Sequence, residues 1–225
     1  MASKKARGKK GERDVIAVLS DIKEVHVLLN DVTFLNEKSG MTHQIDHILI
    51  HPHGVFAIET KNYYGNLTCT EEGFSWYKEV RGRKEKISNP LLQNKNHAIT
   101  LRRILKSKYE VISVVVFARD NAPYTPDENV IGLSDLLLFI DSYPYKALLS
   151  EEDMRFIEKT IKEHACDVTN KEHVENIRYL KQYQREYRAQ VTYALEKGRC
   201  PWCEARIISQ GDLYKCEKCT FEFKL

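Results

Sequence analysis

The sequence has no run of about eighteen consecutive apolar residues, so no transmembrane helix is expected. Its basic N-terminus has no apolar core of the kind that a secretory signal peptide contains. No internal repeat and no low-complexity tract is present either. These absences lead us to expect a cytoplasmic protein without a membrane partner.

A strong excess of one charge is also missing, because the formal net charge of the 225 residues is +3. This balance neither requires nor excludes a nucleic-acid partner. The basic residues are nevertheless clustered: six of the first thirteen residues are Lys or Arg, and VRGRKEK forms a second group at residues 80–86. Such clusters suit contacts with phosphates, although a solvated tail and a solvated turn would have the same composition.

The order of the apolar patterns predicts an α/β domain with a mixed sheet between helices. After a loosely ordered stretch at residues 1–10, a helix is expected at about residues 11–21. A strand at residues 24–31 is expected to end in a turn through Asn30 and Asp31. The run VISVVVFA at residues 111–118 is apolar throughout and predicts a central, buried strand.

Two later helices have clear start signals. Ser88 or Asn89 is expected to cap a helix that has Pro90 in its first position. Ser150 and Asp153 form a capping pattern for a second helix.

Aromatic residues in the last third of the chain allow two interpretations. Tyr179, Tyr183 and Tyr187 recur at four-residue spacing beside Lys and Arg, where a packing stripe is favoured over stacking on nucleic-acid bases. The apolar residues of this segment lie near a short heptad seam, which favours packing on the domain over a coiled coil.

Four of the six cysteines form the strongest single motif, Cys200-Pro-Trp-Cys203 and Cys216-Glu-Lys-Cys219, with twelve residues between the pairs. Two Cys-x-x-Cys pairs supply the four thiolates that structural zinc prefers. Because no position stays open, the expected zinc is structural and folds a segment too small for a core of its own. Cys69 and Cys166 have no such spacing and are expected to be packing residues. The expected apolar support of the segment is Trp202, Tyr214, Phe221 and Phe223, some of which could instead stack on nucleic acid.

Two adjacent strands, HQIDHILIHPHG and VFAIETKN, form the second motif. By the period of two, a hairpin brings Asp46, Glu59 and Lys61 to one side of a sheet. Carboxylates suit Mg²⁺ or Mn²⁺, and a nearby Lys adds positive charge where a phosphodiester transition state becomes more negative. These residue types fit metal-assisted phosphodiester hydrolysis. A salt-bridged Glu59–Lys61 pair at a strand end is the alternative.

Three further side chains are candidates for the same site. Glu12 falls on the inward face of the first helix, as a first-turn acid favoured by the helix dipole or as an acid of the site. Gln93 and His97 lie one helical turn apart, where they could contact water or phosphate.

Histidine ligands for a metal are not expected in the hairpin. His47 points to the side opposite Asp46, and His51 and His53 flank a turn.

The segments GERDVIAVL, QIDHILIHPHGVFAIETKNYYGNL, a following Trp and NPLLQNKNHAITL together resemble the nuclease-related domain, known as NERD, over about residues 8–120. That family is assigned to the PD-(D/E)xK nuclease superfamily, so the resemblance implies a restriction-endonuclease-like mixed sheet flanked by helices. The C-terminal segment resembles a topoisomerase-type zinc ribbon. We therefore predict a NERD domain at residues 8–145, a helical segment at 146–197 and a four-cysteine zinc ribbon at 198–225.

Carried over by position, the resemblance implies a catalytic set of Glu12, Asp46, Glu59, Lys61 and Gln93. Asp46, Glu59 and the backbone carbonyl of Thr60 would bind Mg²⁺ or Mn²⁺, and Glu59 with Lys61 would form the (D/E)xK element.

The function expected from the sequence is that of a metal-dependent nuclease that acts on DNA, with the ribbon aiding nucleic-acid binding. Two alternatives remain open: a non-cleaving nucleic-acid-binding protein on the same fold, and a protein-interaction adaptor.

Overall fold

The computed structural model describes residues 3–36, 41–70, 75–125, 127–144, 147–168 and 170–225. Its contacts divide into two compact units. The first unit comprises Met1–Leu35 and His43–Asp167, and the second comprises Asn36–Thr42 and Val168–Leu225. The domain boundaries at residues 145/146 and 197/198 stay predictions.

A five-stranded mixed sheet forms the centre of the first unit, in the order β1-β2-β3-β7-β8. Strands β2 and β3 are antiparallel, whereas β3, β7 and β8 run parallel to one another. Every residue of β7 is buried, as its apolar run predicted. The strands are β1 (Val27–Asn36), β2 (Met41–His51), β3 (Gly54–Lys61), β7 (Val111–Phe117) and β8 (Val130–Gly132).

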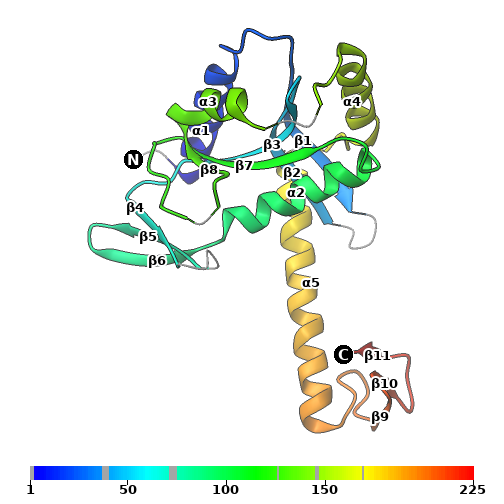
Figure 1. The fold of residues 1–225 in the computed structure, drawn as a ribbon. Helices are drawn as coiled ribbons and strands as arrows, with labels where there is room; N and C mark the ends of the chain where they lie inside the picture. Colours follow the sequence, from blue (N-terminus) through cyan, green and yellow to red (C-terminus); the bar gives the residue numbers. More distant parts are fainter. Residues whose placement is uncertain (1–2, 37–40, 71–74, 126, 145–146, 169) are drawn as a thin grey trace. The chain divides into compact units, whose positions relative to one another are not determined.

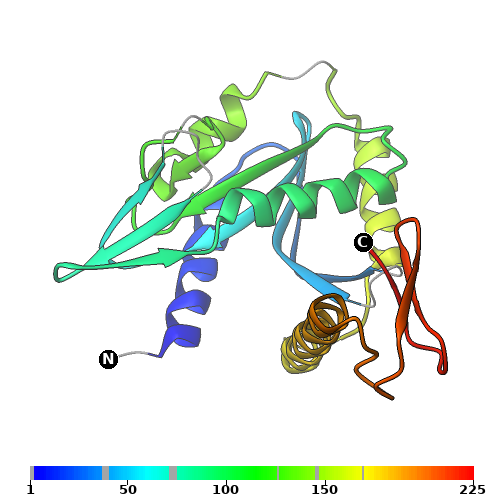
Figure 2. The same cartoon turned by 90° about the horizontal axis from the view of Figure 1, so that it is seen from below.

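Helices cover both faces of this sheet, which confirms the predicted α/β fold class (Figures 1 and 2). Successive residues of a strand point to opposite faces, so each face has its own apolar cluster. One cluster joins β2 and β3 to α2 and α4, and the other joins them to α1 and α3. The helices are α1 (Lys4–Leu19), α2 (Pro90–Ile104), α3 (Leu136–Ser142), which follows the short 3₁₀ helix η1 (Leu133–Asp135), and α4 (Glu151–His164).

The predicted starts of α2 and α4 are confirmed. Asn89 Oδ1 accepts the backbone N–H of Leu92 at 3.2 Å, and Pro90 is the first residue of α2. Ser150 and Asp153 form a reciprocal capping box at the start of α4.

The expectation of a loosely ordered N-terminus is wrong for the described residues, because α1 already begins at Lys4. Ser3 Oγ caps this helix by accepting the N–H of Ala6 at 3.1 Å. Asn62, just beyond β3, donates its Nδ2 to the carbonyl of Arg7 at 2.7 Å. This long-range contact helps to hold the first turns of α1, and no local sequence pattern predicts it.

The expected turn through Asn30 and Asp31 is also wrong. Strand β1 continues to Asn36 although Asp31 has a φ of 55°. Aspartate tolerates this left-handed conformation better than most residues, so the strand passes through a local distortion instead of ending.

A smaller antiparallel sheet, in the order β4-β5-β6, packs beside the main sheet of the first unit through Trp76 and Phe117, whose rings stack 6.1 Å apart. Its strands are β4 (Asn66–Cys69), β5 (Trp76–Val80) and β6 (Arg83–Ile87). The sequence did not predict β6, because RKEKI has no alternation of apolar and polar residues. Arg81 and Gly82, at φ 51° and 73°, form the two-residue turn that pairs it with β5.

The second unit combines the long helix α5 (Asn170–Lys197) with a three-stranded sheet of β9 (Ile207–Gln210), β10 (Leu213–Cys216) and β11 (Glu222–Lys224). The expected packing stripe on α5 is wrong, because Tyr179, Tyr183 and Tyr187 are exposed by 69%, 58% and 39%. In the described part of the chain, α5 is fully buried only near its C-terminal end, where Ala194 belongs to one apolar cluster with Phe221 and Phe223.

In the part of the chain that the structure describes, no helix combines the length and the apolar character needed to cross a membrane.

Candidate active site and zinc ribbon

The β2–β3 hairpin places Asp46 and Glu59 side by side at one of its ends. The pairing of β2 with β3 ends at His47 and Ile58. Asp46 and Glu59 are the next residues of the two strands. The half-buried Asp46 carboxylate accepts the backbone N–H of Thr60 through Oδ2 at 2.8 Å. This bond fixes the orientation of Asp46 relative to β3.

Glu59, Lys61 and Gln93 form a closed set of contacts at this end of the sheet. Glu59 is 2% exposed, and its Oε1 accepts bonds from Lys61 Nζ and, at 2.8 Å, from Gln93 Nε2. Gln93 Oε1 in turn accepts from Lys61 Nζ at 3.2 Å. The structure therefore brings together the two residues from the hairpin and the one from α2 that the sequence singled out.

Helix α2 is held in place over this site by Asn94, which the sequence did not single out. The Asn94 side chain is fully buried, and its Nδ2 donates to the carbonyls of Ala57 and Val114 at 2.8 Å each. These bonds tie the helix to β3 and β7. They also help to position His97 of α2, whose Nδ1 lies 3.5 Å from Glu59 Oε2.

Glu12 contributes from α1 at longer range. It is half-buried, and burial raises its pKa, with smaller contributions from Asp31 and Glu59. Among the described residues, however, Glu12 does not form a three-carboxylate group with Asp46 and Glu59 in which all ligand atoms lie within 4.8 Å. It therefore adds negative potential to the site without joining the two central acids.

Burial and the nearby Glu59 carboxylate raise the pKa of Asp46 to about 8, although the Thr60 N–H and Lys61 oppose this shift. Burial also raises the pKa of Glu59, against the effect of Lys61. Burial lowers the pKa of Lys61, but the adjacent Glu59 carboxylate outweighs it and leaves the pKa above its ordinary value. The carboxyl groups of Asp46 and Glu59 and the ammonium group of Lys61 thus lie close together in a largely buried site.

His47 supports the opposite side of the same strands, as its position in β2 predicted. Its Nδ1 donates to Asn30 Oδ1 at 2.7 Å, and its Nε2 accepts the Thr60 hydroxyl at 3.2 Å. Burial lowers the pKa of His47 to about 4, which keeps the ring neutral. His47 therefore helps to fix Thr60, whose backbone holds Asp46.

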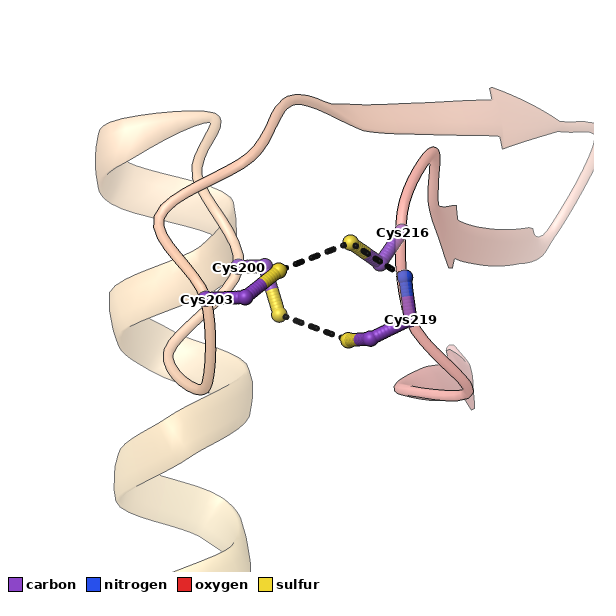
Figure 3. A group of neighbouring side chains, drawn as sticks. All are labelled: Cys200, Cys203, Cys216 and Cys219. Carbon is purple, nitrogen blue, oxygen red and sulfur yellow. Dashed lines mark hydrogen bonds between the residues drawn. The ribbon is translucent and has the colours of Figure 1, made fainter.

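The four cysteines of the C-terminal motif converge in the second unit (Figure 3). The Sγ atoms of Cys200 and Cys219 lie 3.5 Å apart, and those of Cys203 and Cys216 lie 3.4 Å apart. A tetrahedral zinc with Zn–S bonds of about 2.3 Å separates its sulfurs by roughly 3.8 Å. The cluster is therefore compatible with a structural zinc ion.

The aromatic side chains of the ribbon differ in their burial. Phe221 and Phe223 are buried, and Tyr214 stacks on Phe223 with ring centroids 4.9 Å apart. Trp202 is 59% exposed, and its Nε1 donates to Gln190 Oε1 of α5 at 3.1 Å. Support from the two phenylalanines is thus as expected, and Trp202, although exposed, contacts Phe221 with ring centroids 5.1 Å apart.

Comparison with known proteins agrees with this geometry. The family model of the nuclease-related domain matches residues 7–118, the segment that contains most of α1, the β2–β3 hairpin and α2. An uncharacterized protein of Bacillus anthracis is 35% identical over 156 residues, which cover 66% of this chain and 72% of that protein. No solved structure matches the chain at a significant level. This chain belongs to the nuclease-related domain family.

Proposed function

We propose that this protein is a divalent-metal-dependent nuclease that hydrolyses phosphodiester bonds of DNA. The observation that carries the proposal is the meeting of Asp46, Glu59 and Lys61 at one end of the β2–β3 hairpin, with Gln93 bridging Glu59 and Lys61. The assignment of the family to the PD-(D/E)xK superfamily supports the same reaction.

The acids at this site fit a divalent cation. Glu59 Oε2 is buried and has no hydrogen-bond partner among the described residues, and the ionised form of Asp46 is disfavoured beside Glu59. A cation between the carboxylates would remove both costs. Asp46, Glu59 and the Thr60 carbonyl would hold Mg²⁺ or Mn²⁺, which take oxygen ligands. When bound, such an ion polarises a phosphodiester and lowers the pKa of a coordinated water.

Lys61 and Gln93 act on the reacting groups through position and charge. The Lys61 side chain is only 12% exposed, so its charge is weakly screened where negative charge develops in the transition state. Gln93 holds Lys61 against Glu59 and presents an exposed amide that can orient water or phosphate. Glu12 adds a carboxylate at the edge of the site.

Exposed basic residues supply surfaces for the phosphate backbone in each unit. In the first unit, Arg83, Lys84 and Lys86 of β6 are exposed on the hairpin that extends from the small sheet (Figure 1). In the second, Arg178, Lys181, Arg185 and Arg188 are exposed on α5 at spacings of three, four and three residues, which put them on one helix face. The exposed ring of Trp202 adds a surface on which a base could stack.

The experiment is a panel of duplex, single-stranded and branched DNA and matching RNA, each incubated with Mg²⁺ or Mn²⁺. We expect cleavage of DNA by the natural protein, reduced by about 100-fold or more in Asp46→Ala, because loss of a metal ligand costs at least as much as loss of a residue that only orients a ligand. Circular dichroism should show that the variant keeps its fold.

The matched control is Asp21→Asn, which removes an exposed carboxylate near the end of α1 and should cleave at the natural rate. Undiminished cleavage by Asp46→Ala would refute the assignment of the site. Salt-sensitive DNA binding without product under either metal would favour a non-cleaving binding protein, and absence of DNA binding would favour a protein-interaction adaptor.

A further inference from the structure

A second group of potential metal ligands lies at the other end of β2. Glu24 in the α1–β1 connection, His51 at the end of β2 and Asp141 in α3 each offer one ligand atom, and these atoms all lie within 4.8 Å of one another. His51 is 1% exposed, and its Nε2 has no hydrogen-bond partner in the part of the chain that the structure describes. A buried, unpaired ring nitrogen beside two carboxylates requires an explanation.

We propose that Glu24, His51 and Asp141 bind a divalent transition-metal ion of the zinc class. Imidazole nitrogens and carboxylate oxygens are both zinc ligands, and a site with three protein ligands leaves a fourth position for water. Neighbouring ligand atoms around such an ion lie about 3–3.5 Å apart, given bonds of about 2.1 Å. Both carboxylates are exposed and can close the remaining gap by rotation, whereas the buried ring supplies the fixed point of the site.

The electrostatic surroundings favour a cation at this position. Asp141 lies in the last turn of α3, which contains no basic residue, so its negative charge meets the negative end of the helix dipole. Burial lowers the pKa of His51, with a smaller contribution from His53, whereas the carboxylates of Glu24 and Asp141 act in the opposite direction. Metals bind the neutral ring. The cation would therefore offset two carboxylate charges that the described side chains leave without a close ion pair.

The hydrogen bonds around the ring are compatible with coordination. His51 Nδ1 accepts the backbone N–H of His53 at 3.3 Å, near the long limit for such a bond. Coordination through Nε2 moves the ring proton to Nδ1 and gives up this bond, a small loss beside the attraction of a divalent ion for two carboxylates. His53 itself stays anchored, because its Nδ1 contacts the carbonyl of Ile140 at 3.0 Å.

This site is separate from the proposed catalytic centre. His51 is five residues beyond Asp46 on the same strand, a distance of roughly 17 Å. The His51 ring contacts Phe56, a member of the apolar cluster that includes α1 and α3. Asp46 instead lies beside Glu59, whose side chain contacts Gln93 of α2. The ion would tie the end of β2 to α3 and to the connection between α1 and β1.

Calorimetric titration of the full chain with Zn²⁺, after its ribbon has been loaded and weakly bound metal has been dialysed away, tests the proposal. We expect one further zinc per chain, bound at least about tenfold more weakly in Glu24→Gln and in Asp141→Asn, since each loses a ligand. Both substitutions are at exposed positions and should leave the fold intact. Asp21→Asn, which removes an exposed carboxylate three residues from Glu24, should bind zinc as the natural protein does.

Two further measurements identify the site. Zinc should shift the ring resonances of His51, and the additional zinc should remain in the Asp46→Asn background, where the proposed catalytic ligands are impaired. Absence of zinc beyond the ribbon, unchanged affinity in both acid variants or an unmoved His51 ring would each overturn the proposal. None of these readouts depends on nuclease activity.

Discussion

At the scale of single residues, the two central acids oppose each other in the metal-free protein. Asp46 and Glu59 are close enough that Glu59 is the second cause of the raised pKa of Asp46, after burial. Of the two acids, Glu59 accepts a hydrogen bond from the Lys61 ammonium, whereas Asp46 accepts one from a backbone N–H. Two carboxyl groups this close share one ammonium group, so the pH dependence of stability should report the charge on Asp46.

That dependence gives a prediction for Asp46→Asn. The pKa of Asp46 is about 8 in the folded protein and about 3.9 in an unfolded chain, so between these pH values the folded state holds a proton that the unfolded state has released. Stability of the metal-free protein must therefore fall as the pH rises from about 4 to about 8. The variant cannot ionise at this position, so at pH 8 it should be more stable than the natural protein, by on the order of 1 kcal/mol.

Urea unfolding at pH 5 and at pH 8, without added Mg²⁺ or Mn²⁺, measures this difference. Saturating Mg²⁺ at pH 8 should stabilise the natural protein and not the variant, because only the ionised carboxylate gains from the ion. If the free energies of unfolding of the two proteins changed in parallel with pH, the raised pKa of Asp46 would be contradicted.

The central residues of the candidate site were predictable because each strand places alternate residues on one face. That rule was enough for Asp46, Glu59 and Lys61, and the helical repeat was enough for Gln93. Asn94 was not predictable as an anchor, because its partners are backbone carbonyls of two strands that are distant in the sequence. The Glu24–His51–Asp141 group was missed for the same reason, since it joins three elements that no local pattern connects.

At the scale of elements, the contact between α1 and the end of β3 decides where Glu12 lies. A Cβ added at Gly11 would lie 2.8 Å from Asn62 Cβ, which is closer than Cβ atoms approach in proteins. It would also lie 3.3 Å from Ala118 Cβ, which is a tight contact. The helix therefore approaches the sheet at a glycine, immediately before the acid that it carries toward the site. The sequence indicated the helix, but it gave no sign of this close approach.

Two glycines of the same helix form a matched test of that contact. Gly11→Ala should destabilise the protein by about 1–3 kcal/mol through overpacking, in spite of the better helix propensity of alanine. Gly8→Ala should stabilise it by about 0.5–1 kcal/mol, because its Cβ would meet only Glu12 Oε1, at 3.8 Å. Urea unfolding of both variants measures the two signs, and equal shifts would show that α1 does not dock as described.

At the scale of the whole molecule, the two units derive their stability from different sources. The first has an apolar cluster on each face of its main sheet. In the second, the described apolar cluster of the ribbon contains only Ala194, Cys200, Phe221 and Phe223 as fully buried members. We therefore expect a segment with so small a core to depend on a structural zinc ion for folding, because zinc binding contributes about 10–16 kcal/mol in small zinc modules.

The double variant Cys200→Ser, Cys216→Ser tests this division of stability. Removing one thiolate from each pair should abolish the tightly bound zinc, measured by elemental analysis, and should leave the ribbon open to proteolysis. The buried amides of β7 should keep their slow hydrogen exchange, because their protection comes from the first unit. Under the proposed function, DNA affinity at fixed salt should fall by about tenfold while metal-dependent cleavage persists, because the catalytic residues lie outside the ribbon.

Cys69→Ser, Cys166→Ser is the matched control, since it makes the same chemical change at two cysteines outside the cluster. This control should retain the tight zinc, the resistance of the ribbon and the DNA affinity. If the zinc survives in the cluster variant, the four thiolates do not hold it. If β7 loses its protection there as well, the two units unfold together, and the ribbon also stabilises the first unit.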